Sequence, residues 1–449
     1  MTDVPATTLR PALRTWNLIL FGIVAMAPIA GVTMYGFVAA LSGGAVIPAY
    51  LLAGAGVGLT AMSFAAMAEA APGAGSVYGY ASHAMGRFMG FLGGWAILLD
   101  YLLLTALVIV FGAYYLTGAL PWLPLNVATG LFGLFACTVA VAGVSWSSRA
   151  DLASTLAQSL IVVLLVGLAL VVLTGPITTG GPRLPDLWPA SAPLGGVISG
   201  ASAAIIAYIG FDAVSTLAEE VASDVPGVAV GRATLTAVVV MTVVFLATGW
   251  ALSGLSGDLT GLDPPQAGFQ IVRARLPALS LPLGLVTGLA LGMSSSLVCM
   301  SSSARILFAM ARDGHLPEPL SRVHPRMRSP VVAVLTVAVL ATSLAFWALP
   351  HADLLGGLVS FGALSGFLLV NLSVIASYGL RGGSRRWLRH WILPALGTAV
   401  IVYILSGIQT DALQLGAAWT LAGAVLFVLM RWNRQRRHSF EANSKHRPF

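Results

Sequence analysis

Apolar segments long enough to cross a membrane recur along almost the whole chain, and this repetition limits the possible folds more than any other feature. A helix of about 20 apolar residues spans the ~30 Å hydrocarbon core of a bilayer. The chain is 57% hydrophobic and only 9% charged, whereas soluble domains carry about 25% charged residues. The sequence therefore predicts an all-α integral membrane protein without a sizeable soluble domain.

The apolar segments predict twelve transmembrane helices. The third and eighth segments are long, which fits tilted helices or helices that extend past the bilayer. The expected ranges are 16–40, 46–71, 88–116, 124–144, 151–174, 195–221, 231–255, 280–310, 330–349, 352–377, 390–408 and 412–431.

The positions of Lys and Arg predict the orientation of these helices. With both termini inside, the exported loops hold only Arg183, Arg273 and Arg275, and the other basic residues fall on the inner side. Cytoplasmic loops collect Lys and Arg, and exported loops exclude them. We therefore expect a multi-pass protein of the cytoplasmic (inner) membrane, with a cytoplasmic tail at 1–15 and a basic cytoplasmic tail at 432–449.

Several other classes of protein are disfavoured by the residues that the chain contains. The formal net charge of +7 is explained by orientation and by attraction to anionic lipid head groups, so nucleic acid is not an expected partner. The chain has no HExxH motif, no phosphate-binding loop and no metal-spaced Cys/His set. Cys137 and Cys299 lie in apolar segments, where a thiol behaves as a small hydrophobic group. We expect no enzyme activity, no cofactor and no metal site.

Two of the predicted helices contain helix-breaking residues at mid-membrane depth. The first has Pro28 and Gly31 within the run 26–33, and the sixth has Gly210 beside Asp212 within 207–212. Unwound backbone persists in a membrane only against protein or a polar cavity, because unpaired peptide groups cannot face lipid. A kink that serves helix packing is the alternative for either interruption. Two interruptions at corresponding positions favour a binding cavity between them.

The spacing of the interrupted helices predicts an internal repeat. They lie five helices apart, as in an inverted repeat of five plus five helices whose discontinuous first helices meet at a midplane substrate site. The first repeat is expected at 16–194 and the second at 195–380, with the two remaining helices at 381–431.

Seven segments resemble the amino acid/polyamine/organocation transporters. Their wording is most similar to bacterial putrescine importers and related amino acid permeases, although Thr105 stands where that branch often has Pro. The segments are Glu69–Tyr80, Gly90–Trp95, Leu99–Tyr101, Gly210–Glu220, Ala309–Gly314, Phe361–Leu364 and Asn371–Ser373.

The resemblance implies a LeuT-like fold and a secondary active transporter that moves amino acids or polyamines such as putrescine by alternating access. Proton or sodium symport is expected, with exchange of amino acids or amines as the alternative. A channel is the alternative from another class, but channels need a continuous polar pore or charged rings. Here the polar residues gather around two helix interruptions.

The expected substrate site combines freed backbone, carboxylates and aromatic rings. Peptide groups at a half-helix terminus bind a carboxylate or an ammonium group, buried carboxylates bind an ammonium group, and aromatic faces attract cations. For Asp212 an N-cap role is the alternative, and for the aromatic residues the alternative is packing. The expected residues are Ala27, Pro28, Ala30, Gly31, Val32, Tyr35, Asp100, Tyr101, Tyr208, Gly210, Phe211 and Asp212.

Coupling-ion and gate residues are expected near the same two helices. Ser295, Ser296 and Asp212 are the coupling-ion candidates, although serine also allows close packing of helices. Glu219 and Glu220 near the end of the sixth helix are gate candidates, with a solvated helix end as the alternative.

Overall fold

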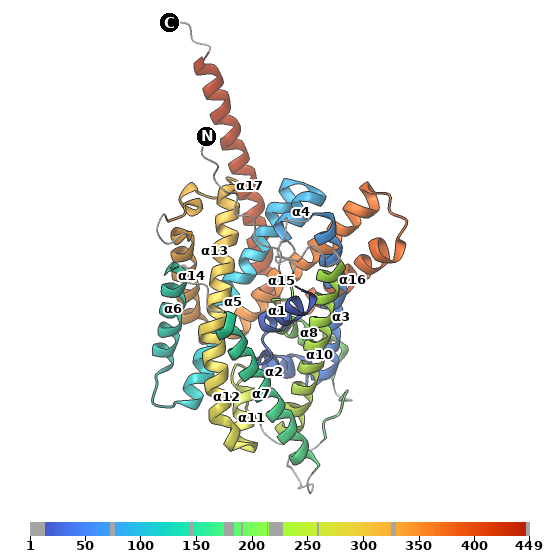
Figure 1. The fold of residues 1–449 in the computed structure, drawn as a ribbon, viewed down its shortest axis with the longest axis vertical. Helices are drawn as coiled ribbons and strands as arrows, with labels where there is room; N and C mark the ends of the chain where they lie inside the picture. The colour runs from blue at the N-terminus through green and yellow to red at the C-terminus, as the bar shows by residue number, and fades with distance from the viewer. Residues whose placement is uncertain are drawn as a thin grey trace.

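The computed structural model describes most of the chain, and every regular element in the described ranges is helical (Figure 1). Side chains are described in these ranges except at 148–151, 228–229 and 431–445. The described ranges are 14–71, 77–142, 148–174, 184–189, 192–212, 214, 228–257, 260–324 and 329–445.

Ten helices in the described part are long and apolar enough to cross a membrane, and a bent pair at the N-terminal end makes eleven. Three of the spans contain a π-helical segment. It lies between two α-helices in the first, after an α-helix in the second and before an α-helix in the third. The ten spans are α3 (Val46–Ala70), α5 (Arg87–Ala119), α6 (Leu125–Ala142), α7 (Ser148–Leu173), α10 (Val228–Ser256), α12 (Pro277–Leu289) with η2 (Ala290–Ser295) and α13 (Ser296–Arg312), α14 (Val331–Ala348), α15 (Ala352–Val374) with η4 (Ile375–Arg381), η5 (Leu388–Ile392) with α16 (Leu393–Leu405), and α17 (Thr410–Lys445).

These spans coincide with the expected ones within a few residues, except that α17 extends well beyond its predicted range. The sixth predicted span is seen only in its first half, as the shorter apolar helix α8 (Leu194–Tyr208). Its continuation at 213 and 215–227 lies outside the described residues. Short helices α4 (Val77–Met85) and α11 (Ala267–Arg275) lie at opposite ends of the molecule (Figure 1). The end that holds α4 is the one that the basic residues assign to the cytoplasm.

The interruption in the first span is confirmed. It separates α1 (Thr15–Met26) from α2 (Ala30–Ser42), and the two helices meet at an angle of 50°. Ala27 adopts φ 52°, a conformation that non-glycine residues rarely take. Pro28 follows it and has no N–H to donate to the helix. The chain therefore leaves the helix at Ala27 and re-enters it after Ile29.

The helix in the sixth span ends where the sequence predicts an interruption. α8 stops at Tyr208, Ile209 is extended with ψ 134°, and Gly210 has φ 111°. A Cβ atom at Gly210 would lie 2.6 Å from the Ala25 carbonyl oxygen. Glycine is required here both by its dihedral angle and by this contact. The two interruptions therefore touch each other.

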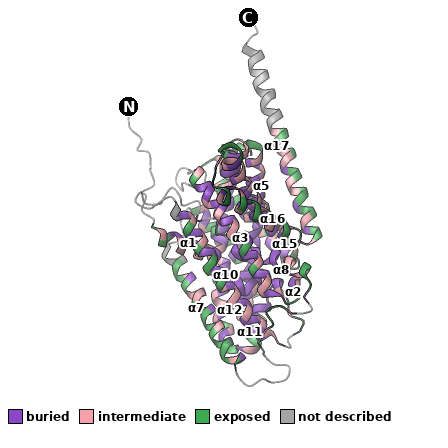
Figure 2. Cartoon of the chain, turned by 90° about the vertical axis from the view of Figure 1, so that its right-hand side faces the viewer, coloured by how far each residue is buried: buried purple, intermediate pink, exposed green. Residues whose placement is uncertain are grey.

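The helix α5 forms the centre of the bundle, whereas the outer helices α7 and α17 carry many exposed residues (Figure 2). The most apolar window of α5 is 89% buried, whereas that of α17 is 11% buried. Leu421, Val425 and Val428 of α17 are more than half exposed. An apolar helix surface of this kind is suited to lipid and not to water. The burial pattern therefore fits a multi-pass membrane protein.

Candidate substrate site

A cavity of about 480 Å³ lies at the interruption of the first span. We call it the central cavity. Its walls come from α1 and α2, from α5, from the end of α8 and from η2 and α13. The lining residues are Ala25, Met26, Ala27, Ala30, Thr33, Met34, Leu104, Leu107, Val108, Phe111, Ile206, Ile209, Leu291, Ser295 and Cys299.

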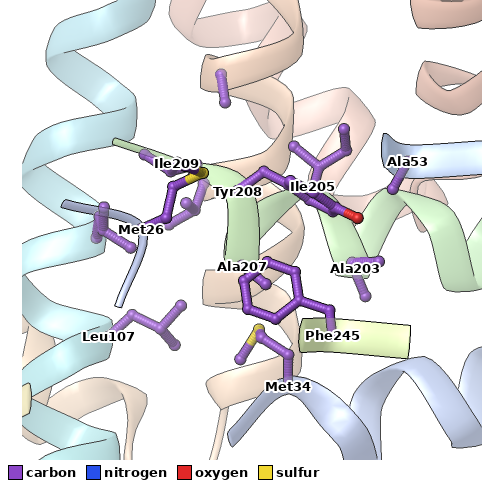
Figure 3. Close-up of a cluster of buried hydrophobic side chains, with 14 of the residues drawn as sticks. Met26, Met34, Ala53, Leu107, Ala203, Ile205, Ala207, Tyr208, Ile209 and Phe245 are labelled. Atoms are coloured by element: carbon purple, nitrogen blue, oxygen red, sulfur yellow. The ribbon is translucent and has the colours of Figure 1, made fainter. Parts of the chain in front are cut away.

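The lining of the central cavity is mainly apolar. Met26, Met34, Leu107 and Ile209 belong to the buried cluster drawn in Figure 3, with Leu107 on α5 and Ile209 just after α8. The side-chain polar groups in the lining are the hydroxyls of Thr33 and Ser295 and the thiol of Cys299. The Thr33 hydroxyl donates to the Ala30 carbonyl oxygen at 3.2 Å. The cavity is therefore suited to a solute with an apolar body and few polar groups.

The non-helical backbone lies a few residues earlier in the chain than the sequence predicted, and this corrects the predicted backbone site. Ala27 and Ala30 line the cavity, but α2 already begins at Ala30. The Ala30 N–H donates to the Ala27 carbonyl oxygen at 2.9 Å, and the Val32 N–H donates to Ile29 at 2.9 Å. The non-helical backbone is therefore at Ala27, Pro28 and Ile29, where the Ile29 N–H donates to Gln158 Oε1 at 3.5 Å and the Ala27 N–H donates to the Val24 carbonyl oxygen at 3.3 Å.

Gly31 serves close packing and does not break the helix. A Cβ atom at this position would lie 3.0 Å from the ring of Phe245 and 3.3 Å from Thr248. The Gly31 carbonyl oxygen accepts a hydrogen bond from the Tyr50 hydroxyl at 3.4 Å. The Val32 carbonyl oxygen accepts one from Tyr115 at 3.2 Å. The sequence predicts that this glycine interrupts the helix, and that prediction is wrong. A glycine is needed here because α10 approaches too closely for a larger side chain.

Three of the four predicted aromatic walls pack elsewhere. Tyr208 is buried beside Phe245, with ring centroids 5.0 Å apart, and its hydroxyl donates to the Tyr50 carbonyl oxygen at 3.2 Å (Figure 3). Phe211 packs edge to face against Phe64 of α3 and against Phe367 of α15. Tyr35 is also buried and does not line the cavity. These rings stabilise the helix packing around the site.

Asp100 and Asp212 form a buried pair just behind the cavity wall. Their exposed fractions are 1% and 9%. The hydroxyl of Tyr101, the fourth predicted aromatic residue, donates to Asp212 Oδ2 at 3.2 Å. The two carboxyl groups lie within electrostatic range of each other and of the Cys299 thiol, which lines the cavity. The structure thus brings the two predicted acids together, on elements far apart in the sequence, without placing either on the cavity lining.

The local shape of α5 beside this pair is regular. Thr105 is buried, and its hydroxyl donates to the Tyr101 carbonyl oxygen at 2.7 Å within a continuous helix. Gly362 of α15 faces Asp100, because a Cβ atom there would lie 2.8 Å from the Asp100 backbone nitrogen. The small residue opposite lets α15 close over the carboxyl group.

The two serine candidates have different surroundings. Ser295 ends the π-helical turn η2 and lines the central cavity. Ser296 is fully buried, and its hydroxyl donates to the Gly292 carbonyl oxygen at 2.5 Å. Single π-turns inside helices often mark functional sites. Of the remaining candidates, Glu219 and Glu220 lie outside the described residues. Within the described part of the chain, no group of three acidic, His or Cys residues could hold a metal ion.

The sequence reasoning missed most of the apolar lining. Leu104, Leu107, Val108 and Phe111 follow the helical spacing of one face of α5, beginning one turn after Asp100. Continuing the helical face of Asp100 along α5 would have identified these four residues. Cys299 was treated as a packing residue, although it lies one helical turn after Ser295.

Comparison with known proteins establishes the family. The family model described as amino acid permease matches residues 13–430. The chain belongs to this family. Its members are transporters and not enzymes, and membership implies a LeuT-like fold for this multi-pass membrane protein.

Curated relatives carry different solutes. The chain is 29% identical to the methylthioribose transporter of Bacillus subtilis over 384 residues, which cover 82% of this chain and 81% of the relative. It is 26% identical to the low-affinity putrescine importer PlaP of Escherichia coli over 430 residues, 93% of each chain. It is also 26% identical to the branched-chain amino acid permease BcaP of B. subtilis over 463 residues, 96% of this chain and 94% of the relative. The chain is thus an amino acid and polyamine permease family transporter.

Proposed function

We propose that this chain is a secondary active transporter that takes up an amino acid with a neutral, apolar side chain by alternating access. It has twelve membrane spans, with an inverted repeat of five plus five helices and both termini in the cytoplasm. The observation that carries the proposal is the central cavity at the junction of the two helix interruptions. Such junctions are where transporters of this architecture bind their substrates.

The cavity supports a neutral amino acid through its two kinds of surface. The side chain of the solute would lie against Leu104, Leu107 and Phe111 of α5. Its amino and carboxylate groups would lie at the non-helical backbone around Ala27, which lines the cavity. The Gly31 N–H forms no hydrogen bond with the described backbone and stands in the first turn of α2, where an anion is favoured by the helix terminus.

Coupling to protons is supported by the position of Asp100. Its Oδ1 atom is buried and has no hydrogen-bond partner within the described residues. A charged group inside a membrane costs at least about 2.5 kcal/mol at a helix centre. A bound proton removes that cost, and the Asp100–Asp212 pair is therefore the proposed proton site. Sodium binding near Ser295 is the alternative mode of coupling, and exchange without net ion flow is the alternative mode of transport.

A polyamine such as putrescine is a second candidate substrate. The observation that favours it is the acidic pair, which lies within electrostatic range of Cys299 on the cavity wall. A small movement of that wall would expose a carboxylate to a solute ammonium group. A potential of 100 mV, negative inside, would favour entry of a divalent amine by roughly 4.6 kcal/mol.

Uptake into liposomes tests these proposals. Purified protein is reconstituted, and uptake of labelled leucine, lysine and putrescine is measured under an imposed proton gradient, an imposed sodium gradient and neither. Saturable, proton-driven leucine accumulation is the expected result. Accumulation of putrescine and not leucine would favour the second candidate, and accumulation driven by sodium alone would reject the proton site. A substrate-insensitive current that does not saturate would overturn the carrier mechanism in favour of a channel.

A further inference from the structure

A second cavity, of about 400 Å³, lies next to the central cavity along α2. We call it the vestibule. Met34, Leu107, Phe111 and Ile206 line both cavities. The vestibule continues along α2 through Phe37 to Leu41, toward the end of the bundle that the basic residues assign to the exterior. A solute that enters from this end reaches the vestibule first.

The vestibule ends in a carboxylate. Asp353 in the first turn of α15 and Gln409 just before α17 line it together with Ser202 and Ser360. The two serine hydroxyls are occupied by backbone carbonyl groups: Ser360 donates to Ser202 at 2.7 Å, and Ser202 donates to Ser199 at 2.7 Å. The hydroxyl protons are thus committed, and the Asp353 carboxylate is the charged group of the lining.

Asp353 takes part in none of the ion pairs found among the described residues. The ion pairs of the described residues join Arg312, Arg322 and Arg389 to other acidic residues. Asp353 is exposed. Its place in the first turn of α15 is favourable for a negative charge in any case, but that role does not require it to line a cavity.

The remaining lining of the vestibule is apolar and aromatic. Phe37 and Phe111 pack edge to face, with ring centroids 5.9 Å apart, and both line the cavity. Aromatic faces attract organic cations. One end of the site thus suits a cationic head and the other an apolar body.

We propose that the vestibule is a binding site for organic ammonium ions with a short apolar body, held by the Asp353 carboxylate and the Gln409 amide oxygen. A transported amino acid places its ammonium group in this site before it passes between Met34, Phe111 and Ile206 to the central cavity. The order of passage rests on the transport function proposed above, whereas binding in the vestibule does not require transport.

A cysteine reporter tests binding without transport. Gly356 lines the vestibule three residues after Asp353 on the same face of α15, and a Cβ atom there meets only Ile206 Cδ1, at 3.4 Å. Gly356→Cys is placed in a Cys137→Ser/Cys299→Ser background. The rate of its modification by neutral methyl methanethiosulfonate is then measured with n-butylammonium or with butyrate.

The expected result is protection by n-butylammonium and not by butyrate. In Asp353→Asn, the concentration needed for half protection should rise by about fivefold or more, because the opposite charge is lost. Asp411→Asn is the matched control, since Asp411 is an exposed carboxylate in the first turn of α17 that does not line the vestibule, and it should leave protection unchanged.

Equal protection in Asp353→Asn, equal protection by butyrate, or no protection by n-butylammonium would overturn the proposal. Solute uptake by the same variants separates this result from the transport function. Protection without uptake counts against the proposed transport function alone. Uptake without protection counts against the vestibule site alone.

Discussion

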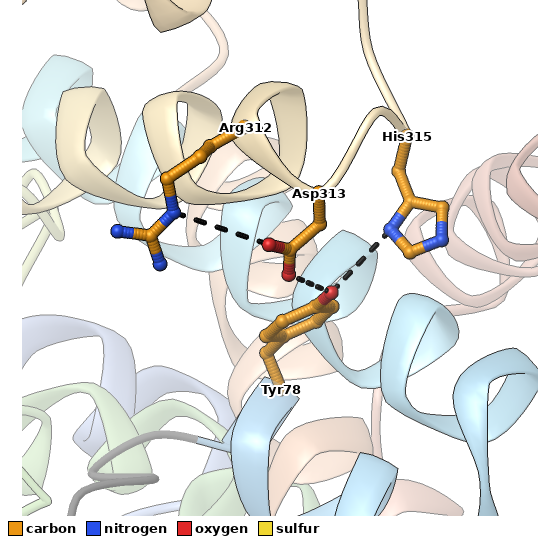
Figure 4. Close-up of polar contacts among 4 residues, drawn as sticks. All are labelled: Tyr78, Arg312, Asp313 and His315. Carbon is orange, nitrogen blue, oxygen red and sulfur yellow. Dashed lines mark hydrogen bonds and ion pairs between the residues drawn. The ribbon is translucent and has the colours of Figure 1, made fainter.

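The hydroxyl of Tyr78 donates a 2.5 Å hydrogen bond to Asp313 Oδ2, which joins α4 to the residue that follows α13 (Figure 4). The ring nitrogen Nδ1 of His315 lies 3.4 Å from the same hydroxyl, and Arg312 Nε lies 3.9 Å from Asp313 Oδ1. This cluster lies at the end of the bundle that is expected to face the cytoplasm. It connects the segment after the second span to the eighth span, and we expect this link to favour closure of that end.

Replacing Tyr78→Phe should weaken this closure. The loss of one charge-assisted hydrogen bond at a partly exposed site should lower the free energy of unfolding by about 0.5–1.5 kcal/mol. It should also increase labelling of Cys299 by thiol reagents added from the cytoplasmic side. Thermal unfolding in detergent and labelling in inside-out vesicles measure the two effects. Tyr403→Phe, at an exposed position of α16, is the control, and an equal change in that variant would contradict the assignment.

The effect of Tyr78→Phe should not change between pH 6 and pH 9. Burial first, and then the hydrogen bond to Asp313, raise the pKa of Tyr78 above its ordinary value, which is about 10. A raised pKa means that the folded protein favours the neutral hydroxyl. This contribution to stability is fully present below the ordinary pKa and is lost as the pH rises above it. A difference in melting temperature that shrinks between pH 6 and pH 9 would contradict this reasoning.

Asn substitutions should separate the roles of the two buried carboxyl groups. We expect Asp100→Asn to retain leucine counterflow but to lose accumulation driven by a proton gradient, by about tenfold or more as for an essential proton-transfer group. Asp212→Asn should impair both, because it also removes the negative charge from the group that accepts the hydrogen bond of the Tyr101 hydroxyl. Asp411→Asn is the exposed control. Unchanged gradient-driven uptake in Asp100→Asn would remove this residue from the proton site.

Hydropathy predicted the membrane spans closely, because it depends on the bilayer and not on details of packing. The break in the first span was also predictable, since Pro28 cannot continue a helix. Its position was not. Glycine has a low intrinsic helix propensity, but Gly31 lies inside α2 because the neighbouring Phe245 leaves no space for a side chain. Tertiary packing here overrides propensity.

The aromatic residues show a second limit of sequence reasoning. Tyr208 and Phe211 flank an interruption next to the cavity, yet their rings point into the packed interior. The direction of a side chain at an interrupted helix depends on the dihedral angles of the break, and Gly210 at φ 111° sets these. The sequence identifies such a break but not the direction in which the next side chain turns.

Filling the central cavity should reduce the size of the accepted solute. Ala30 lines the cavity in the first turn of α2, and Ala30→Leu adds apolar volume where the solute side chain would lie. Leucine uptake should fall by about tenfold or more, as expected from the cost of overpacking, about 1–3 kcal/mol. Alanine uptake should be less affected. Ala40→Leu, at an exposed position on the same helix, is the control, and equal losses of leucine and alanine uptake would indicate that the cavity does not set solute size.

Gly210→Ala should destabilise the protein. The position has φ 111°, and the new Cβ atom would lie 2.6 Å from the Ala25 carbonyl oxygen. Backbone strain of this kind costs about 1–3 kcal/mol, and the clash forces the two interruptions apart. The melting temperature in detergent and the leucine uptake should both fall. Gly195→Ala is the matched control, because it lies in the first turn of α8 with no atom within 4 Å of the added Cβ. If both variants melt and transport like the parent protein, the contact between the two interruptions is not required for the site.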